Sequence, residues 1–271
     1  MALVPFPGKQ SGALALPADD DELESESPGG RMSFLEHLDE FRKRIVHSCL
    51  YIAGGVIVGF FFIDHIFNFL MAPARATLPL GATMIYTQPG EAFNLYITVS
   101  LIAGVLIASP FVMMQVWLFI APGLYSKEKM LAIPFVIFST IGLVGGAAFN
   151  HYVAFPFIMA FFGSFNSADL RFMPRLDDVF GLYTKMLIGI ALVFQMPTVV
   201  FFLAKMRMVT ARFLVRNFKY AILLIFVAAA VITPTGDPMT QAIFAAPMLG
   251  LYLFSIVVAW LVGPKRVVAD A

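Results

Sequence analysis

The chain has 271 residues, of which 60% are apolar and only 13% are charged, and phenylalanine alone occurs 29 times. A soluble domain of this size cannot bury so many apolar side chains, so the composition excludes a soluble globular protein and indicates a membrane protein. The formal net charge of +1 excludes the broad basic surface of a nucleic-acid-binding protein.

The first segment, residues 1–30, differs in composition from the rest of the chain. It contains small residues and prolines, followed by the acidic run DDDELESESPGG at 19–30. This composition is typical of disorder, and the segment lacks the basic start and apolar stretch of a secretory signal peptide. We therefore expect a disordered cytoplasmic tail over 1–30, a membrane domain over 31–264 and a short cytoplasmic tail over 265–271.

The stretch SFLEHLDEFRKRI at 33–45 predicts an amphipathic helix lying at the cytoplasmic surface of the membrane. Ser33 is a suitable N-cap, and Glu36 three residues later completes a capping box. On the polar face, Asp39 can pair with Lys43 and Glu40 with Arg44, each one helical turn apart. By themselves these pairs favour a solvated helix face over a binding site.

Continuous apolar runs follow. A helix rises about 1.5 Å per residue, so about 20 apolar residues cross the roughly 30 Å hydrocarbon core. The runs lie near residues 45–63, 92–119, 130–152, 179–204, 220–232 and 242–262. Because they show no alternating pattern, a transmembrane barrel is not expected, and the sequence predicts an all-α membrane protein of six transmembrane helices.

Lysine and arginine residues mark the cytoplasmic side. They gather before the first run, between runs two and three, between runs four and five, and after the last: Arg31, Arg42, Lys43, Arg44, Lys127, Lys129, Lys205, Arg207, Arg212, Arg216, Lys219, Lys265 and Arg266. The opposite side carries Arg75, Arg171, Arg175 and Lys185. By the positive-inside rule, both termini are expected to be cytoplasmic, which requires an even number of spans.

Three features predict departures from a straight bundle. The fifth run, 220–232, is short for a normal bilayer before the residues TPTGDP end it at 233–238. The segment 64–91 is long enough to form a cap over the outer face. Prolines inside the runs predict bends at Pro110, Pro134, Pro156, Pro197 and Pro247. We therefore expect bent helices that form a concave shape.

Four motifs occur in a characteristic order. HLDEFRKRI at 37–45 is followed by QVWLFIAPGLYSKEK at 115–129, HYVAFPF at 151–157 and ITPTGDPMTQAIFAAPM at 232–248. They resemble, in turn, the HLxELRxRL signature, first cytoplasmic loop, third span and fifth-to-sixth connection of the TatC family, the multispanning core of the twin-arginine protein translocase. The resemblance covers about residues 33–264 and implies six spans with both termini inside.

The resemblance implies a receptor for signal peptides with consecutive arginines, which exports folded proteins using the proton-motive force. Two guanidinium groups require cytoplasmic carboxylates that accept forked, charge-assisted hydrogen bonds. The family roles correspond to Glu40 in EFR and Glu128 in SKEK, with Glu36 as a further candidate. Arg42 is expected to support the pocket or to meet lipid phosphate.

The motif that contains Glu128 supplies further candidate residues for signal-peptide recognition, namely Phe119, Pro122, Leu124 and Tyr125. For any one of them, an alternative is an interfacial aromatic anchor with a proline turn. Pro73 matches a family position in the outer cap, where it is expected to form a structural turn.

Polar residues within the spans are also candidates, because an unpaired polar group is costly in lipid. Gln195 lies where many members of the resembled family have a buried glutamate, so a titrating role there is in doubt, and a satisfied amide is the alternative. Thr233, Asp237 and Gln241 lie where the family receives the single-span partners TatA and TatB. Asp237 can equally cap the sixth helix.

The sequence does not indicate an enzyme. No GxxxxGK, HExxH or GxSxG motif occurs, and the four histidines lack ligand spacing, so no cofactor or metal is expected. A secondary transporter is the alternative, but paired midplane charges and an internal repeat are missing. Asp177 and Asp178 are adjacent, which does not suit an intramembrane protease. We expect a multi-pass protein of the bacterial cytoplasmic (inner) membrane, in contact with lipid and forming a homo-oligomer within its complex.

Overall fold

A computed structural model of the chain describes residues 34–78, 84–120, 131–167, 172–233 and 238–263, and these ranges are helical without a β-strand. In chain order the elements are α1 (Phe34–Phe61), α2 (Ile63–Thr77), α3 (Glu91–Ile120), α4 (Ala132–Phe149), the π-helical turn η4 (Asn150–Ala154), α5 (Phe155–Gly163), α6 (Leu176–Val193), α7 (Met196–Lys205), α8 (Ala211–Arg216), α9 (Phe218–Ile232) and α10 (Pro238–Val262). The predicted tails, including Ser33, lie outside the described residues.

Most of these helices are apolar enough to cross a membrane. In the described ranges, five segments qualify: Leu35–Phe61, Glu91–Ile120, Ala132–Gly163, Leu176–Lys205 and Thr240–Val262. Helix α9 is also apolar, but its 15 residues extend about 22 Å, less than the roughly 30 Å core. The predictions of an all-helical membrane protein and of a short fifth apolar run are therefore confirmed.

Helix α1 departs from the sequence-based expectation. The sequence predicted a separate surface helix over 33–45 followed by the first span, whereas the structure has one uninterrupted helix from Phe34 to Phe61. No proline or glycine occurs between residues 34 and 53. Nothing therefore interrupts the backbone hydrogen bonds where the amphipathic stretch meets the apolar run, and the prediction of a separate helix was wrong.

Two prolines follow interruptions of a long helical segment. The π-turn η4 lies directly before Pro156, and the turn between α6 and α7 lies directly before Pro197. Proline lacks an amide hydrogen and its ring crowds the preceding turn, which explains both positions. Helices α3 and α10, in contrast, are assigned as continuous through Pro110 and Pro247, and Pro134 stands near the start of α4.

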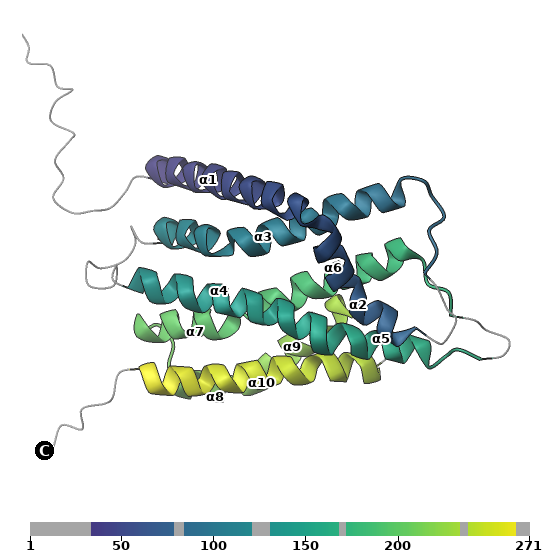
Figure 1. The fold of residues 1–271 in the computed structure, drawn as a ribbon. Coiled ribbons are helices and arrows are strands. Elements are labelled where there is room, and N and C mark those ends of the chain that lie inside the picture. Colours follow the sequence, from purple (N-terminus) through teal and green to yellow (C-terminus); the bar gives the residue numbers. More distant parts are fainter. Residues whose placement is uncertain (1–33, 79–83, 121–130, 168–171, 234–237, 264–271) are drawn as a thin grey trace, which may run out of the picture.

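Helices α1 and α3 pack against each other through glycines (Figure 1). A Cβ atom added to Gly104 of α3 would lie 2.6 Å from the backbone nitrogen of Val56 in α1. One added to Gly55 of α1 would lie 2.5 Å from the carbonyl oxygen of Gly104. The two backbones therefore approach as closely as small residues allow, a common arrangement between helices in lipid.

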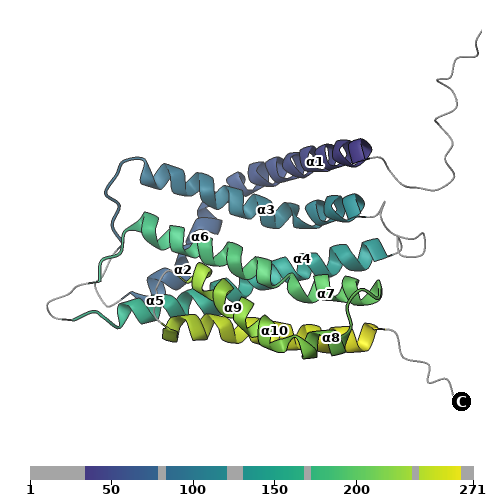
Figure 2. The ribbon, with the colours of Figure 1, turned by 180° about the vertical axis from the view of Figure 1, so that it is seen from behind.

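The other helices surround a second, larger core. Phe155, Ile158, Tyr183 and Met186 are fully buried among α2, η4, α5 and α6, while α10 packs on α7 and α9. Seen from behind, α8, α9 and α10 lie together on one side of this group (Figure 2). Many large apolar side chains on the outside remain exposed, as expected for a surface that meets lipid.

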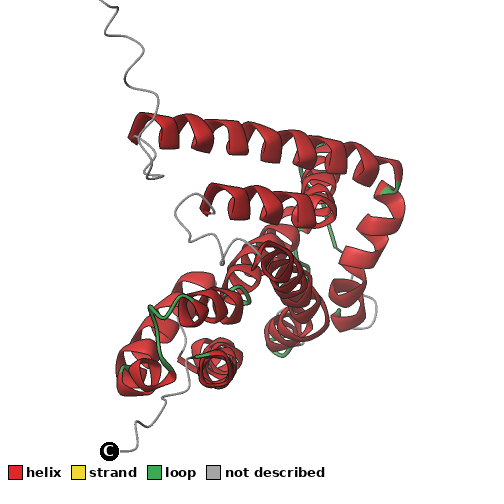
Figure 3. Cartoon of the chain, turned by 90° about the vertical axis from the view of Figure 1, so that its left-hand side faces the viewer, coloured by secondary structure: helices red, strands yellow, loops and turns green. Residues whose placement is uncertain are grey.

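The helix ends divide into two sets. The start of α1, the end of α3, the start of α4, the ends of α7 and α10, and α8 lie on the left of Figure 1. Helices α2 and α5 lie toward the opposite end (Figure 1). A perpendicular view shows α1 set apart from the group that contains α10 (Figure 3). The start of α1, which carries a basic cluster, and the segment that follows α7 therefore lie at one end of the molecule.

Candidate functional site

The first polar site lies where α1 meets the last turns of α3. Arg44 donates a hydrogen bond from Nη2 to Oε1 of Glu40 at 3.0 Å, and another from Nη1 to Oε1 of Gln115 at 3.3 Å. Gln115 belongs to α3 and is buried, while the Glu40 and Arg44 side chains are 16% and 30% exposed. The ion pair expected from the i, i+4 spacing is thus confirmed, and it is tied to the neighbouring helix.

This carboxylate retains binding capacity. The second oxygen of Glu40, Oε2, is buried and has no hydrogen-bond partner among the described residues, and the same holds for Nε of Arg44. A carboxylate accepts hydrogen bonds on both oxygens, and an unsatisfied one in a half-buried place is costly. Arg44 therefore holds Glu40 by one oxygen, and the other is left without a partner among the described residues.

Aromatic rings adjoin this carboxylate. The ring of Phe119 on α3 stacks on His37 of α1, with centroids 4.5 Å apart, and lies 5.2 Å from the ring of Phe41. Phe119 is half-buried, one residue before the end of α3. These rings fix the ends of α1 and α3 against each other, and they exclude water from one side of the site.

The remaining predicted recognition residues are placed differently. Glu36 and Arg42 lie on α1 and are exposed. Pro122, Leu124, Tyr125 and Glu128 fall in 121–130, outside the described residues. That segment begins directly after Ile120, where α3 ends beside His37 and Phe119. The structure thus brings Glu40 and Phe119 to one place.

The predicted intramembrane polar residues make contacts within the chain. Gln195, between α6 and α7, donates from Nε2 to the carbonyl oxygen of Ser139 in α4 at 3.0 Å, so its amide is satisfied by another helix. Gln241 of α10 donates to the carbonyl oxygen of Phe226 in α9 at 2.7 Å. The buried Thr233 hydroxyl bonds within its own helix end, to Ala229. Asp237 lies outside the described residues.

Pro73 lies inside a helix rather than in a turn. It belongs to α2, and its carbonyl oxygen accepts a 3.0 Å hydrogen bond from the Thr77 hydroxyl. The expectation of a structural turn at this residue is therefore wrong. Helices α2 and α5 pack against each other, and the ring of Phe69 in α2 stacks on the buried His151 at 4.1 Å.

A second ion pair, which the sequence analysis missed, lies at the other end of the molecule. Arg175 donates from Nη2 to Oε1 of Glu91, whose side chain is 6% exposed. The same carboxylate accepts hydrogen bonds from the amide and hydroxyl of Thr87, at 3.0 and 3.2 Å. Hydrogen bonding to Glu91 raises the pKa of Arg175, so the pair stays ionised. Adjacent backbone bonds join Ile85 to Pro174 and Leu176.

We call the contact made by Thr87, Glu91 and Arg175 the outer latch. It joins the segment before α3 to the segment before α6. Replacing Glu91 with glutamine is expected to speed amide hydrogen exchange in residues 84–90 and 172–178, because the neutral side chain no longer holds Arg175. Hydrogen exchange followed by mass spectrometry measures this.

Asp177→Asn is the matched control for the latch, because it also removes one negative charge near Arg175 but from an exposed carboxylate. Exchange in that variant should match the unmodified protein. Equal exchange in Glu91→Gln and the unmodified protein would show that the backbone bonds alone hold the two segments together.

A third polar cluster is buried at the π-turn. His151 Nδ1 lies 3.4 Å from the Tyr183 hydroxyl, and Asn150 donates to the Tyr183 carbonyl oxygen at 3.5 Å. π-turns often accompany functional positions. Among the described residues, no three histidine, cysteine, aspartate or glutamate side chains are grouped so that they could hold a metal ion.

Comparisons with known proteins agree with one another. Residues 36–247 match the family model described as Sec-independent protein translocase protein (TatC). The chain is 43% identical to the protein of that name from Koribacter versatilis, over 92% of this chain and 93% of the relative, and 40% identical to that from Desulforapulum autotrophicum, over 86% of each. It is also similar to a crystal structure of the twin-arginine translocase receptor TatC, with a TM-score of 0.72, 33% identity, and coverage of 84% of this chain and 99% of that one.

Proposed function

We propose that this chain, which belongs to the TatC family of Sec-independent protein translocase proteins, is the receptor for twin-arginine signal peptides and the core subunit of their translocase. In this role it exports folded proteins across the cytoplasmic membrane using the proton-motive force. The comparisons give no support to the alternative of a small-solute transporter. The Glu40 carboxylate, with one oxygen held by Arg44 and the other without a partner, carries the proposal.

The binding mode follows from this carboxylate. A guanidinium group of the peptide donates to Oε2 of Glu40, which is buried and desolvated, and Phe119 lies beside it. Glu128 is the acceptor for the second guanidinium, since its segment begins at the end of α3. Glu36, Arg42, Pro122, Leu124 and Tyr125 surround the peptide in this proposal. Charge-assisted hydrogen bonds from a planar guanidinium, which can also stack on an aromatic ring, favour arginine over lysine at such a site.

The proposed topology has six spans, with α9 as the short fifth and both termini cytoplasmic in the bacterial inner membrane. Its support is the basic residues near the ends of α1 and α7, which lie at one end of the molecule (Figure 1). Helix α2, which contains Pro73, then lies on the outer side as a cap. The interrupted helices support the concave shape that the sequence predicts.

TatA and TatB are the proposed single-span partners, and they meet the chain at α9 and α10. A short α9 leaves its end at membrane depth, next to Thr233 and to Gln241 of α10, so the partner helices can pack there. We propose that Asp237 belongs to this surface. Gln195 is proposed to take part in contacts within the complex. Several copies of the chain are expected within one assembly.

The test is peptide binding by the purified protein at low salt. A peptide with two consecutive arginines should bind at least about tenfold more tightly than the same peptide with two lysines, a difference of about 1.4 kcal/mol. Fluorescence anisotropy of labelled peptides with protein in lipid nanodiscs measures both affinities. Equal affinities would contradict recognition of arginine, and no binding of either peptide would contradict the receptor function.

A further inference from the structure

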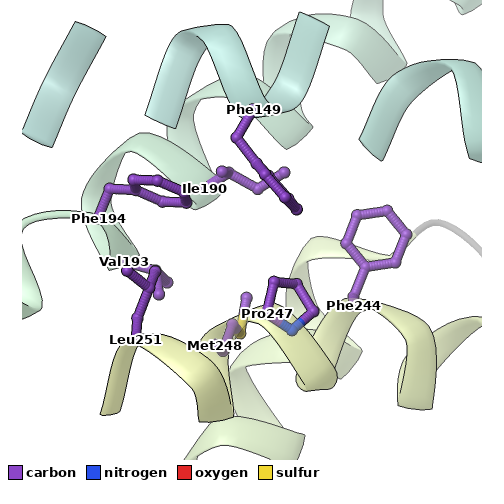
Figure 4. A pocket seen from close by; sticks show the side chains of 8 residues that line it. All are labelled: Phe149, Ile190, Val193, Phe194, Phe244, Pro247, Met248 and Leu251. Atoms are coloured by element: carbon purple, nitrogen blue, oxygen red, sulfur yellow. The ribbon is translucent and has the colours of Figure 1, made fainter. Parts of the chain in front are cut away.

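An apolar furrow runs along α10 on the side that faces α4, α6 and α7. It has a wider recess at each end, about 200 Å³ where it meets α5 and about 510 Å³ near the ends of α7 and α10. Between them the cavity volume falls to about 10 Å³, where eight side chains converge (Figure 4). Phe194 and Leu251 line both the narrow part and the larger recess, so the spaces are adjacent.

The larger recess, which we call the inner recess, is shaped for a chain rather than for a helix. Its lining along α10 runs from Leu251 to Val262, about 16 Å of helix, which is close to half of the roughly 30 Å hydrocarbon core. The narrow part blocks a helix of about 10 Å diameter from lying along the whole furrow. On α4, Gly142 and Gly145 line the recess and have no side chains that would fill it. It therefore suits one flexible apolar chain confined to a single leaflet.

A cluster of cations stands at the mouth of the inner recess. Phe201 lines the recess, and Lys205 follows it by four residues on the same face of α7, exposed at the helix end. Four more follow: Arg207, Arg212, Arg216 and Lys219. No aspartate or glutamate occurs between residues 179 and 232, so this cluster has no acidic neighbour along the chain. Basic clusters at such a membrane border attract anionic lipid headgroups.

The backbone at Arg207 supports a role for its charge. Arg207 has φ 61°, and the amides of Met208 and Arg207 bond to the carbonyl oxygens of Leu203 and Ala204. This is the Schellman ending of a helix, in which glycine is usually found at the left-handed position. An arginine is conformationally unfavourable there, so its presence points to a contact made by the side chain.

We propose that the inner recess binds one acyl chain of an anionic phospholipid from the cytoplasmic leaflet, with the phosphate headgroup held by Lys205 and Arg207. The site is distinct from the Glu40 carboxylate and does not depend on it. Apolar contact along Phe201, Leu251 and Gly145 holds the chain, and charge-assisted hydrogen bonds select the headgroup. A bound lipid of this kind would fill the space between α7, α10 and the end of α4 and hold these helices together.

Native mass spectrometry of the full chain, released from nanodiscs of equal parts phosphatidylglycerol and phosphatidylcholine, tests the proposal. One phosphatidylglycerol per chain should be retained at least about tenfold over phosphatidylcholine, and Lys205→Gln and Arg207→Gln should each reduce that preference several-fold. Gly145→Leu should abolish retention of the lipid by filling the recess. The fold should tolerate this change, because a Cβ atom at Gly145 meets nothing closer than 3.7 Å.

Two control variants match these changes. Lys185→Gln removes an exposed cation from the middle of α6 that does not line the recess, and Gly54→Leu adds the same side chain as Gly145→Leu where a Cβ meets nothing within 4 Å. Both should retain lipid normally. Twin-arginine peptide binding should be unchanged in every variant, which separates this test from the receptor function.

Three results would overturn the proposal. Equal retention of the two lipids would show that the cations do not select the headgroup. Normal retention in Gly145→Leu would place the bound chain elsewhere. Loss of a co-purifying single-span protein in Gly145→Leu, with lipid retention unchanged, would show that the recess belongs to a protein helix.

Discussion

Replacing Glu40 with glutamine is expected to weaken binding of a twin-arginine peptide by about 10- to 100-fold, since hydrogen bonds to charged groups contribute about 1.5 to 3 kcal/mol. Glutamine keeps the size of the side chain and can still accept a hydrogen bond from Arg44. It presents a single acceptor oxygen without charge, so the peptide guanidinium loses the charged acceptor that Oε2 provides. Peptide titration by fluorescence anisotropy at low salt measures the loss.

Asp39→Asn provides the matched control for the Glu40 variant. Asp39 is the preceding residue of the same helix and is exposed, so this change removes the same charge without touching the site. Its peptide affinity should stay within about threefold of the unmodified protein, as expected for a solvent-exposed charge that makes no direct contact. Similar losses in both variants would mean that general negative charge, and not the Glu40 carboxylate, attracts the peptide.

Replacing Gly104 with leucine is expected to disrupt the packing of α1 on α3 and to cost about 1–3 kcal/mol or more, the range for overpacked interiors. The Cβ atom would lie 2.6 Å from the backbone nitrogen of Val56, and no rotamer change relieves a clash with backbone. Because Glu40 and Gln115 lie on these two helices, the variant should also lose peptide affinity. Thermal unfolding in detergent and the peptide titration measure both effects.

Gly54→Leu separates this packing effect from the general cost of adding leucine to a membrane helix. Gly54 lies in α1 beside Gly55, but a Cβ atom there meets nothing within 4 Å. Its melting temperature and peptide affinity should be close to those of the unmodified protein. If Gly104→Leu melted at the same temperature as Gly54→Leu, the close approach of α1 and α3 would not contribute to stability.

The sequence predicted the features that depend on local pattern. The apolar runs predicted the helices, including the short α9, because the thickness of the bilayer sets the length of a membrane-spanning apolar helix. The i, i+4 spacing predicted the pair of Glu40 with Arg44. Prolines predicted the interruptions before Pro156 and Pro197, although α3 and α10 continue through theirs. In those two helices the surrounding packing decides the outcome.

Features that join distant segments were not predictable. Gln115 is 71 residues from Arg44, and Arg175 is 84 residues from Glu91, so no local pattern relates them. The only signals were a glutamine near the end of the mainly apolar run at 92–119 and a glutamate just before that run. For Gln195, the sequence left open a satisfied amide, and the bond to Ser139 shows which helix provides the acceptor.

A double-mutant cycle between peptide and protein tests the central claim, that the Glu40 carboxylate binds the arginine pair. The change from two arginines to two lysines should cost at least about tenfold in affinity on the unmodified protein and less than about threefold on Glu40→Gln, because the acceptor that distinguishes the two cations is gone. The same cost on both proteins would show that the arginines bind elsewhere.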